Sequence, residues 1–211
     1  MYSSPACLAH EFEPGSTDPQ QTLDVARWRK AQRERLLAER RVLHATGTQA
    51  AAAAIAVRLD ALLDERFGPV SGLILSAWWP IKGELDLRFW LTDLVARGAR
   101  VALPVVVERN APLHFRAWTP STRMERGVWN IPVPAEGEAL HPQVTLAPLV
   151  GYDDARYRLG YGGGYFDRTL AARVPCPLAV GVGLASARLA TIYPQPHDVP
   201  MDVVVTEEGR P

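Results

Sequence analysis

The sequence has few features that would direct the chain to a membrane, to nucleic acid or to an oxidising compartment. Its 211 residues include only two cysteines, Cys7 and Cys176, which is typical of a reduced, cytosolic protein. No apolar run approaches the length of a membrane span, and residues 1–22 lack the apolar stretch of a secretory signal. The formal net charge is +0, so no global field attracts nucleic acid or anionic lipid. We therefore expect a cytoplasmic protein that recognises anions only locally.

The sequence also lacks the motifs of nucleophilic catalysis and the standard nucleotide-binding loops. There is no Gly-x-Ser-x-Gly elbow, and neither cysteine lies in an activating motif, so the sequence does not indicate nucleophilic catalysis. There is no Gly-x-x-x-x-Gly-Lys-Ser/Thr loop either, and the glycines at 160–164 depart from the dinucleotide-binding spacing. Any phosphate site must therefore use a different loop.

The pattern that is present alternates strand-like and helix-like segments. Helices are expected at 24–43, 48–66, 85–97 and 165–173, and strands at 72–78, 100–107, 144–150, 178–183 and 203–206. Residues 113–118 predict an edge strand or a hairpin, and residues 119–142 a mostly extended loop. This order predicts an α/β fold with a mostly parallel sheet covered on both faces. We expect a single domain over residues 23–211 after a flexible N-terminal tail, residues 1–22.

A glycine-rich segment from Arg158 to Asp167 is the most specific motif. Its four glycines are Gly160, Gly162, Gly163 and Gly164. Glycines let backbone N–H groups approach an anion, and the start of the following helix adds partial positive charge, so the segment predicts a phosphate site. Arg158 would pair with phosphate oxygens, and Asp167 would either cap the helix or hold Mg²⁺. The alternative is a tight strand-to-helix crossover without a ligand.

The first expected helix is strongly basic. Arg29, Arg33 and Arg40 lie within roughly 40° of one another around a helix with ~100° per residue, so they form one ridge. A solvated face is the simplest interpretation of this ridge. A partner for the phosphate loop is the second. A third is binding of single-stranded nucleic acid together with exposed tryptophans, which the neutral total charge and the acidic residues Asp167 and Asp198 disfavour.

Further candidate residues follow predicted strands. The segment from Trp78 to Asp86 comes after a strand, where ligands bind in parallel α/β sheets. Its Glu84 either starts a helix or acts in binding or catalysis. Trp79 and Trp129 would suit a flat heteroaromatic ring or belong to the core. Asp198, in a turn before the last strand, would either be a second Mg²⁺ carboxylate or stabilise the turn.

Six segments in order make the sequence resemble the 5-formyltetrahydrofolate cyclo-ligase (methenyltetrahydrofolate synthetase) family. They are the basic helix, Pro80-Ile-Lys-Gly-Glu84, the strand ending at Leu103-Pro104, Trp129-Asn-Ile-Pro132, Arg158–Asp167, and His197-Asp198 through Asp202 to Thr206-Glu207. The resemblance runs from about Trp28 to Glu207. It implies a three-layer α/β/α fold and the ATP- and Mg²⁺-dependent closure of 5-formyltetrahydrofolate to 5,10-methenyltetrahydrofolate, with release of ADP and phosphate.

The resemblance also implies residue roles. Glu84 and Arg158 would be catalytic. ATP would be bound by Arg29, Lys30, Arg33, Arg158, Leu159, Gly160, Tyr161, Gly162, Gly163, Gly164, Tyr165 and Phe166. The reduced folate would contact Trp79, Glu84, Trp129, Tyr161 and Tyr165, and Mg²⁺ would be held by Asp167 and Asp198. No protein partner is indicated.

Four positions depart from the family pattern. Arg29 stands where the family often has lysine, and Lys30 is adjacent, so the sequence leaves open which of the two side chains reaches the phosphate. Arg156 stands where the family usually has glycine, so we expect the turn there to be reshaped. Phe166 replaces a tyrosine, and Ala187 replaces a common glutamine. These changes leave open a divergent relative that uses ATP to activate a different carbonyl or carboxylate.

Overall fold

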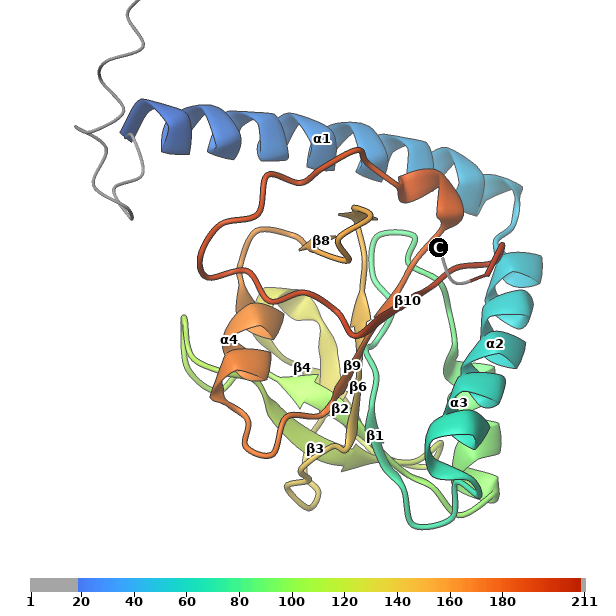
Figure 1. Ribbon diagram of the computed structural model, residues 1–211. Coiled ribbons are helices and arrows are strands. Elements are labelled where there is room, and N and C mark those ends of the chain that lie inside the picture. The colour runs from blue at the N-terminus through green and yellow to red at the C-terminus, as the bar shows by residue number, and fades with distance from the viewer. Residues whose placement is uncertain (1–18, 210–211) are drawn as a thin grey trace, which may run out of the picture.

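A six-stranded sheet with the strand order β10-β9-β6-β1-β2-β3 organises the chain (Figure 1). The structure is a computed structural model that describes residues 19–209. The strands are β1 (Ile74–Ser76), β2 (Arg100–Val105), β3 (His114–Trp118), β6 (Val144–Pro148), β9 (Leu178–Val182) and β10 (Val203–Val205). All neighbours pair in parallel except β3, which runs antiparallel to β2 at the sheet edge. The predicted mostly parallel sheet and the predicted edge strand are both confirmed.

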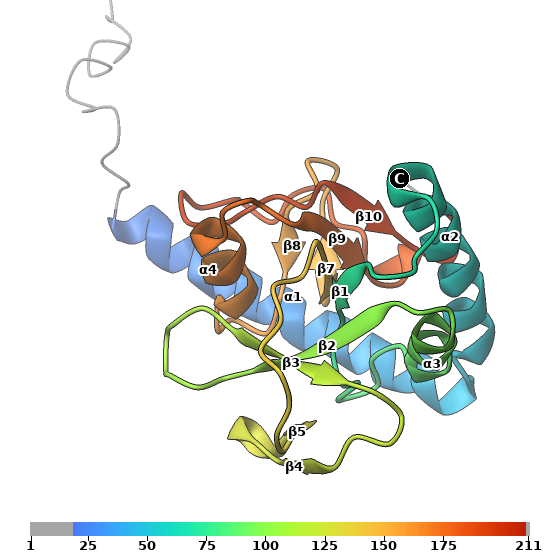
Figure 2. The same cartoon turned by 90° about the horizontal axis from the view of Figure 1, so that it is seen from below.

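Helices cover both faces of this sheet, which confirms the three layers (Figure 2). The helices α2 (Gln49–Phe67) and α3 (Arg88–Ala96) pack on one face, and α4 (Tyr165–Ala172) packs on the other. Leu59 and Leu94 join Leu146 in the larger core, whereas Leu170 of α4 joins Val204 on the opposite face. No helix among residues 19–209 is long and apolar enough to cross a membrane.

The long helix α1 (Pro19–Thr46) belongs to neither layer and lies across the carboxyl-end side of the sheet (Figure 1). Its Leu36 is buried against Val150, Leu159 and Ile192, which belong to the segments at that end. The helix begins at Pro19, five residues before the predicted start, because proline is well accepted in a first helical turn. The rest of the predicted tail, residues 1–18, lies outside the described residues.

Two small antiparallel ribbons were not predicted. The first pairs β4 (Met124–Arg126) with β5 (Pro132–Pro134) around the 3₁₀ turn η2 (Val128–Asn130), inside the segment expected to be mostly loop. The second pairs β7 (Gly151–Tyr152) with β8 (Arg158–Leu159). A further 3₁₀ turn, η3, spans Ala185–Ala187. Strands of two or three residues, some with prolines, are too short to show alternation in the sequence.

The turn between β7 and β8 corrects the expectation about Arg156. Arg156 itself adopts φ 66°, the left-handed region that a glycine would favour. Hydrogen bonds hold it there: its Nη1 donates to the Asp202 carbonyl at 2.9 Å, and its own carbonyl accepts from Met201 N–H at 3.0 Å. The turn is therefore kept and strained rather than reshaped.

Candidate functional site

A cavity of about 670 Å³ opens at the carboxyl end of the sheet. Its volume is in the range of small-molecule sites. Its walls are α1, the segment after β1, the β4–β5 ribbon, the glycine loop and the turn before β10. They include Arg29, Arg33, Trp79, Glu84, Trp129, every residue from Arg158 to Asp167, and Asp198. Of the predicted site residues, only Lys30 does not line this cavity.

The glycine loop runs from the end of β8 to the start of α4. At Gly160 a Cβ atom would lie 2.5 Å from Nη1 of Arg158, so any larger residue would displace that guanidinium. Gly162 has φ +96°, a conformation that side chains with a Cβ rarely adopt. The loop therefore keeps its backbone bare at the wall of the cavity, as a phosphate-binding loop requires.

Arg33 joins the basic helix to this loop. Its Nε donates to the Gly160 carbonyl at 2.7 Å, and its guanidinium carbon lies 3.5 Å from the position that a Cβ of Gly162 would take. Burial and the neighbouring Arg29 lower the pKa of Arg33 from its ordinary value. Within residues 19–209, only Nε of this guanidinium is hydrogen-bonded, which leaves two terminal nitrogens for an anionic ligand.

Arg29 is held by the turn before β10. Its guanidinium pairs with both oxygens of Asp198, and its Nε donates to the Ile192 carbonyl at 2.9 Å. Burial opposes ionisation of Asp198, but the hydrogen bonds from Arg29 and from Gln195 N–H keep its pKa below the ordinary value. Lys30 points away: its side chain is 76% exposed and lies 4.0 Å from Glu34. The structure brings Arg29, and not Lys30, to the cavity.

Arg158 forms a buried ion pair beneath the loop. Its Nη2 donates to Asp167 Oδ2 at 2.7 Å, and its guanidinium lies 5.1 Å from the Phe166 ring centroid. Burial lowers the pKa of Arg158, and the charge of Asp167 opposes that effect. Asp167 also accepts from Val199 N–H at 3.3 Å, and Gly164 stands at the N-cap of α4. Asp167 therefore does not cap the helix. Its ion pair with Arg158 instead lies buried beneath the glycine loop and supports it.

Asp167 and Asp198 suit a Mg²⁺ ion that is also bound by phosphates. Among residues 19–209, no three histidine, cysteine or acidic side chains group as a metal site. Asp167 and Asp198 are neighbours through Val199, and each is already bound to an arginine. Magnesium in nucleotide sites takes one or two carboxylates and completes its shell with phosphates and water. This donor set fits an ion that arrives with phosphates, not one held by the protein alone.

Glu84 is a buried carboxylate at the wall of the cavity, with 5% exposure. Its Oε2 accepts from Ile81 N–H at 2.8 Å, and its Oε1 accepts from the Tyr161 hydroxyl at 3.0 Å. Burial raises its pKa from the ordinary 4.5 to about 7, although Ile81 N–H, Arg40, Tyr161 and Lys82 act in the opposite direction. Because α3 begins only at Arg88, Glu84 does not start a helix.

Several aromatic side chains line the cavity. Trp129 is 65% exposed and meets Tyr165 edge to face, with 5.4 Å between ring centroids. It has φ 55° in η2, where the Gly127 N–H to Ile131 carbonyl bond closes the ribbon. Trp79 is partly buried under the Arg88 guanidinium, 4.7 Å from the ring centroid. An exposed indole in a strained turn at a cavity suits a flat ring better than a core.

Known proteins resemble this chain in sequence and in fold. The model of the 5-formyltetrahydrofolate cyclo-ligase family matches residues 25–207. The chain belongs to this family. A 5-formyltetrahydrofolate cyclo-ligase of Mycolicibacterium smegmatis is 34% identical over 148 residues, which are 65% of this chain and 75% of that protein.

Two solved cyclo-ligase-family structures show the same fold. The 5,10-methenyltetrahydrofolate synthetase of Aquifex aeolicus is 28% identical with a TM-score of 0.69, over 86% of this chain and 91% of that one. That of Mycoplasma pneumoniae is 22% identical with a TM-score of 0.68, over 85% of this chain and 98% of that one.

The departures from the cyclo-ligase pattern leave the cavity intact. Phe166 lacks a hydroxyl, but its ring packs under Arg158 and against the core around Leu170. Ala187 is partly buried against Leu36 and its neighbours. Neither residue adds a charge to the site.

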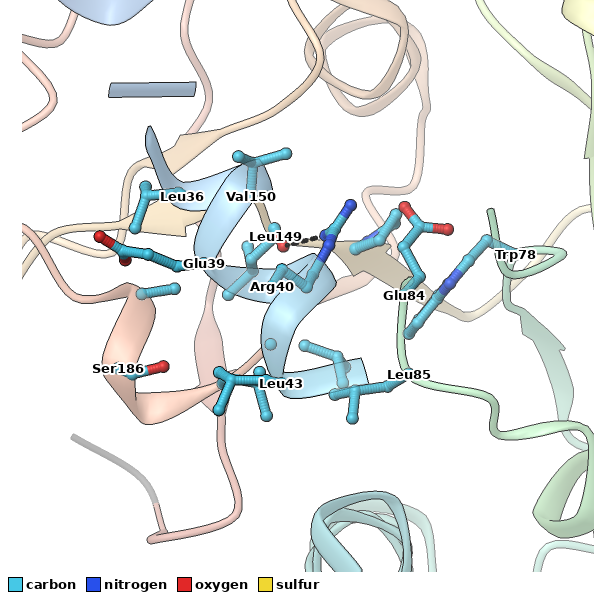
Figure 3. A pocket seen from close by; sticks show the side chains of 15 residues that line it. Leu36, Glu39, Arg40, Leu43, Trp78, Glu84, Leu85, Leu149, Val150 and Ser186 are labelled. Carbon is cyan, nitrogen blue, oxygen red and sulfur yellow. Dashed lines mark hydrogen bonds between the residues drawn. The ribbon is translucent and has the colours of Figure 1, made fainter. Parts of the chain in front are cut away.

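Two residues near Glu84 were not assigned a role from the sequence. They are Arg40, at the inner end of the predicted arginine ridge, and Lys82, in the turn before Glu84. Helical spacing places Arg40 on the ridge, but only the folded chain shows that its guanidinium faces Glu84 (Figure 3).

Proposed function

We propose that this chain catalyses the ATP-dependent closure of 5-formyltetrahydrofolate to 5,10-methenyltetrahydrofolate, with release of ADP and phosphate. One observation carries the proposal beyond family membership. A glycine loop with an available guanidinium, Arg33, and a buried carboxylate, Glu84, face a single cavity. A phosphate donor and an acceptor would thus meet inside one enclosure.

The reaction needs positioning more than covalent catalysis. The formyl oxygen takes the γ-phosphoryl group of ATP, N10 then forms a bond to the activated carbon, and phosphate leaves with the oxygen. Transfer of this kind depends on alignment and charge neutralisation. We assign phosphate binding to Arg33 and the loop Gly160–Gly164, with Arg29 beside them, and support of the loop to Arg158. This revises the catalytic role predicted for Arg158.

Glu84 is suited to the proton of N10. That nitrogen loses a proton when the ring closes, and a base with a pKa near neutrality accepts it most effectively. Glu84 has such a pKa, about 7, because of its burial. The exposed Trp129 and the ring of Tyr165 would hold the pteridine, and Trp79 and Tyr161, which also line the cavity, would contact the folate.

We place Mg²⁺ with the phosphates, next to Asp167 and Asp198, where it would neutralise phosphate charge. We also propose that the enzyme works in the cytoplasm, which suits its two-cysteine composition. Nucleic-acid binding is not favoured, because Arg29, Arg33 and Arg40 turn inward to the site instead of forming a solvated ridge.

The test is a direct assay. Purified protein with Mg·ATP and 5-formyltetrahydrofolate should produce the absorbance of the methenyl product, with one ADP released for each product. Glu84→Gln should bind ATP normally and lose at least ~100-fold in kcat, as for a lost acid–base group. Glu136→Gln, a change at an exposed carboxylate, serves as the control. ADP release only with another carbonyl or carboxylate would support the divergent alternative, and absence of ATP binding would refute both.

A further inference from the structure

We propose that Arg40 is a positioning residue that sets the charge of Glu84 through the hydroxyl of Tyr161. The inference rests on the proposed function, because it gives Glu84 a role in turnover. It concerns a residue near the C-terminal end of α1 that neither the predicted ATP contacts nor the predicted folate contacts include.

The three side chains form a directed chain of hydrogen bonds. An Arg40 guanidinium nitrogen, Nη2, donates to the Tyr161 hydroxyl oxygen. That hydroxyl in turn donates to Glu84 Oε1 at 3.0 Å. A hydroxyl that accepts from a cation becomes a stronger donor, because hydrogen bonds in series polarise one another. Arg40 therefore stabilises the charged form of Glu84 through two successive hydrogen bonds.

Arg40 is held in this position by α1 and by the sheet. Its Nη1 donates to the Leu149 carbonyl at 3.4 Å, at the end of β6, and its guanidinium carbon is 5.7 Å from the Tyr161 ring centroid. Figure 3 shows the Arg40 side chain on α1 and the Glu84 side chain on the segment after β1, with the hydrogen bond from Arg40 to the Leu149 carbonyl dashed. The side chain is partly buried, so its charge is screened less than that of a surface arginine.

The other charged groups near Glu84 do not replace Arg40. Lys82 comes from the same turn as Glu84 and lies 5.4 Å from the Tyr161 ring centroid, but its side chain is exposed. His44 of α1 packs against Gly83 and is exposed. Arg40 is the partly buried cation that is hydrogen-bonded to the network. Tyr161 belongs to the glycine loop, and its hydroxyl contacts both Arg40 and Glu84.

The consequence is a shift in pH dependence. An opposite charge nearby favours the ionised form of a carboxyl group, with shifts of roughly one to three pH units at close range. Without the Arg40 charge, Glu84 binds its proton more tightly, so its titration moves to higher pH. The acid limb of kcat, which requires ionised Glu84, should move up by about one pH unit.

The experiment compares Arg40→Met, Arg40→Gln and Arg40→Lys with Arg41→Met, a change at the adjacent exposed arginine. The first readout is the midpoint of the acid limb of kcat. The second is the ¹³C NMR titration of the Glu84 carboxyl, identified by the signal lost in Glu84→Gln. Both midpoints should rise in the Met and Gln variants, stay near wild type in Arg40→Lys, and not move in Arg41→Met. Arg40→Gln keeps a hydrogen-bond donor, so it covers the case in which Arg40→Met fails to fold.

A double-mutant comparison tests whether the effect of Arg40 on Glu84 passes through the Tyr161 hydroxyl. The shift caused by Arg40→Gln should be smaller in a Tyr161→Phe background than in wild type. An unchanged NMR midpoint in Arg40→Gln would overturn the proposal, even if kcat fell. An equal shift in both backgrounds would overturn the role of Tyr161. The NMR titration needs no turnover, so a wild-type protein without cyclo-ligase activity but with a shifted Glu84 in Arg40→Gln would sink the proposed function alone.

Discussion

Three arginines of the site carry the same charge, but their hydrogen-bond partners differ, so they differ in whether they can bind a ligand. Arg158 is enclosed with Asp167, and Arg29 is held by Asp198 and two backbone carbonyls. Arg33 uses only Nε within the described residues, so it retains donors for a phosphate. Burial and pairing, rather than residue type, decide which guanidinium meets a ligand.

Also at the residue scale, the burial of Glu84 should make the free energy of unfolding depend on pH. Its pKa rises on folding to about 7, so between roughly pH 4.5 and 7 the folded state binds more protons than the unfolded state. Stability from this group is therefore present below pH 4.5 and is lost as pH rises to 7. The loss is on the order of 3 kcal/mol, since one pKa unit is worth about 1.4 kcal/mol.

We expect Glu84→Gln to gain stability relative to wild type as pH increases, since glutamine carries no charge to bury. Urea unfolding at pH 5, 6, 7 and 8 measures the difference. A constant difference over this range would show that Glu84 keeps an ordinary pKa in the folded protein.

At the scale of elements, α1 and the β7–β8 ribbon do most to shape the site. The helix α1 spans the carboxyl-end side of the sheet and supplies Arg29, Arg33 and Arg40 at helical spacing. The ribbon ends at Leu159 and so sets where the glycine loop begins. Its turn is strained at Arg156, held by contacts to the segment before β10.

The strain at Arg156 can be tested with a matched pair of variants. Arg156→Ala and Arg156→Gly both remove the hydrogen bond to the Asp202 carbonyl. Only glycine adopts φ 66° without a Cβ penalty. We expect Arg156→Gly to be more stable than Arg156→Ala by about 1 kcal/mol, measured from urea midpoints. A more stable alanine variant would mean that the turn changes conformation.

At the scale of the whole molecule, the cavity exists only when distant segments assemble. Arg33 and Gly160 are separated by 127 positions in the sequence, and Arg29 and Asp198 by 169. A ligand that binds only this assembled state must stabilise all of its segments together. Mg·ATP at about 100 times its Kd should add about 2.7 kcal/mol to the free energy of unfolding.

Hydrogen exchange with Mg·ATP should therefore slow in α1, in the glycine loop and in the turn before β10 together. Arg33→Met should raise the Kd for ATP roughly 10- to 100-fold, because it removes charge-assisted hydrogen bonds. Arg35→Met, at an exposed arginine of the same helix, should leave the Kd unchanged. Protection confined to the glycine loop would contradict a site shared with α1.

Much of the fold could be predicted from the sequence, and the reason is periodicity. Helical spacing and apolar strand runs locate α2, the parallel strands and the edge strand β3. The short ribbons could not be predicted, because two or three residues carry no period. Of the site, the loop, Glu84 and the ridge could be identified as candidates, whereas the finding that Lys30 points away from the cavity required the orientation of α1.

The sequence by itself determined the α/β class, the glycine loop and the family, because spacing, composition and motif order are local properties of the chain. Only the tertiary structure decided how these pieces act. In the folded chain Arg158 is buried in an ion pair with Asp167, and Arg33 keeps unused hydrogen-bond donors. Arg40 is hydrogen-bonded to Tyr161, which is hydrogen-bonded to Glu84. These outcomes depend on burial and on charges from distant segments, and desolvation and pairing energies arise only when the segments meet.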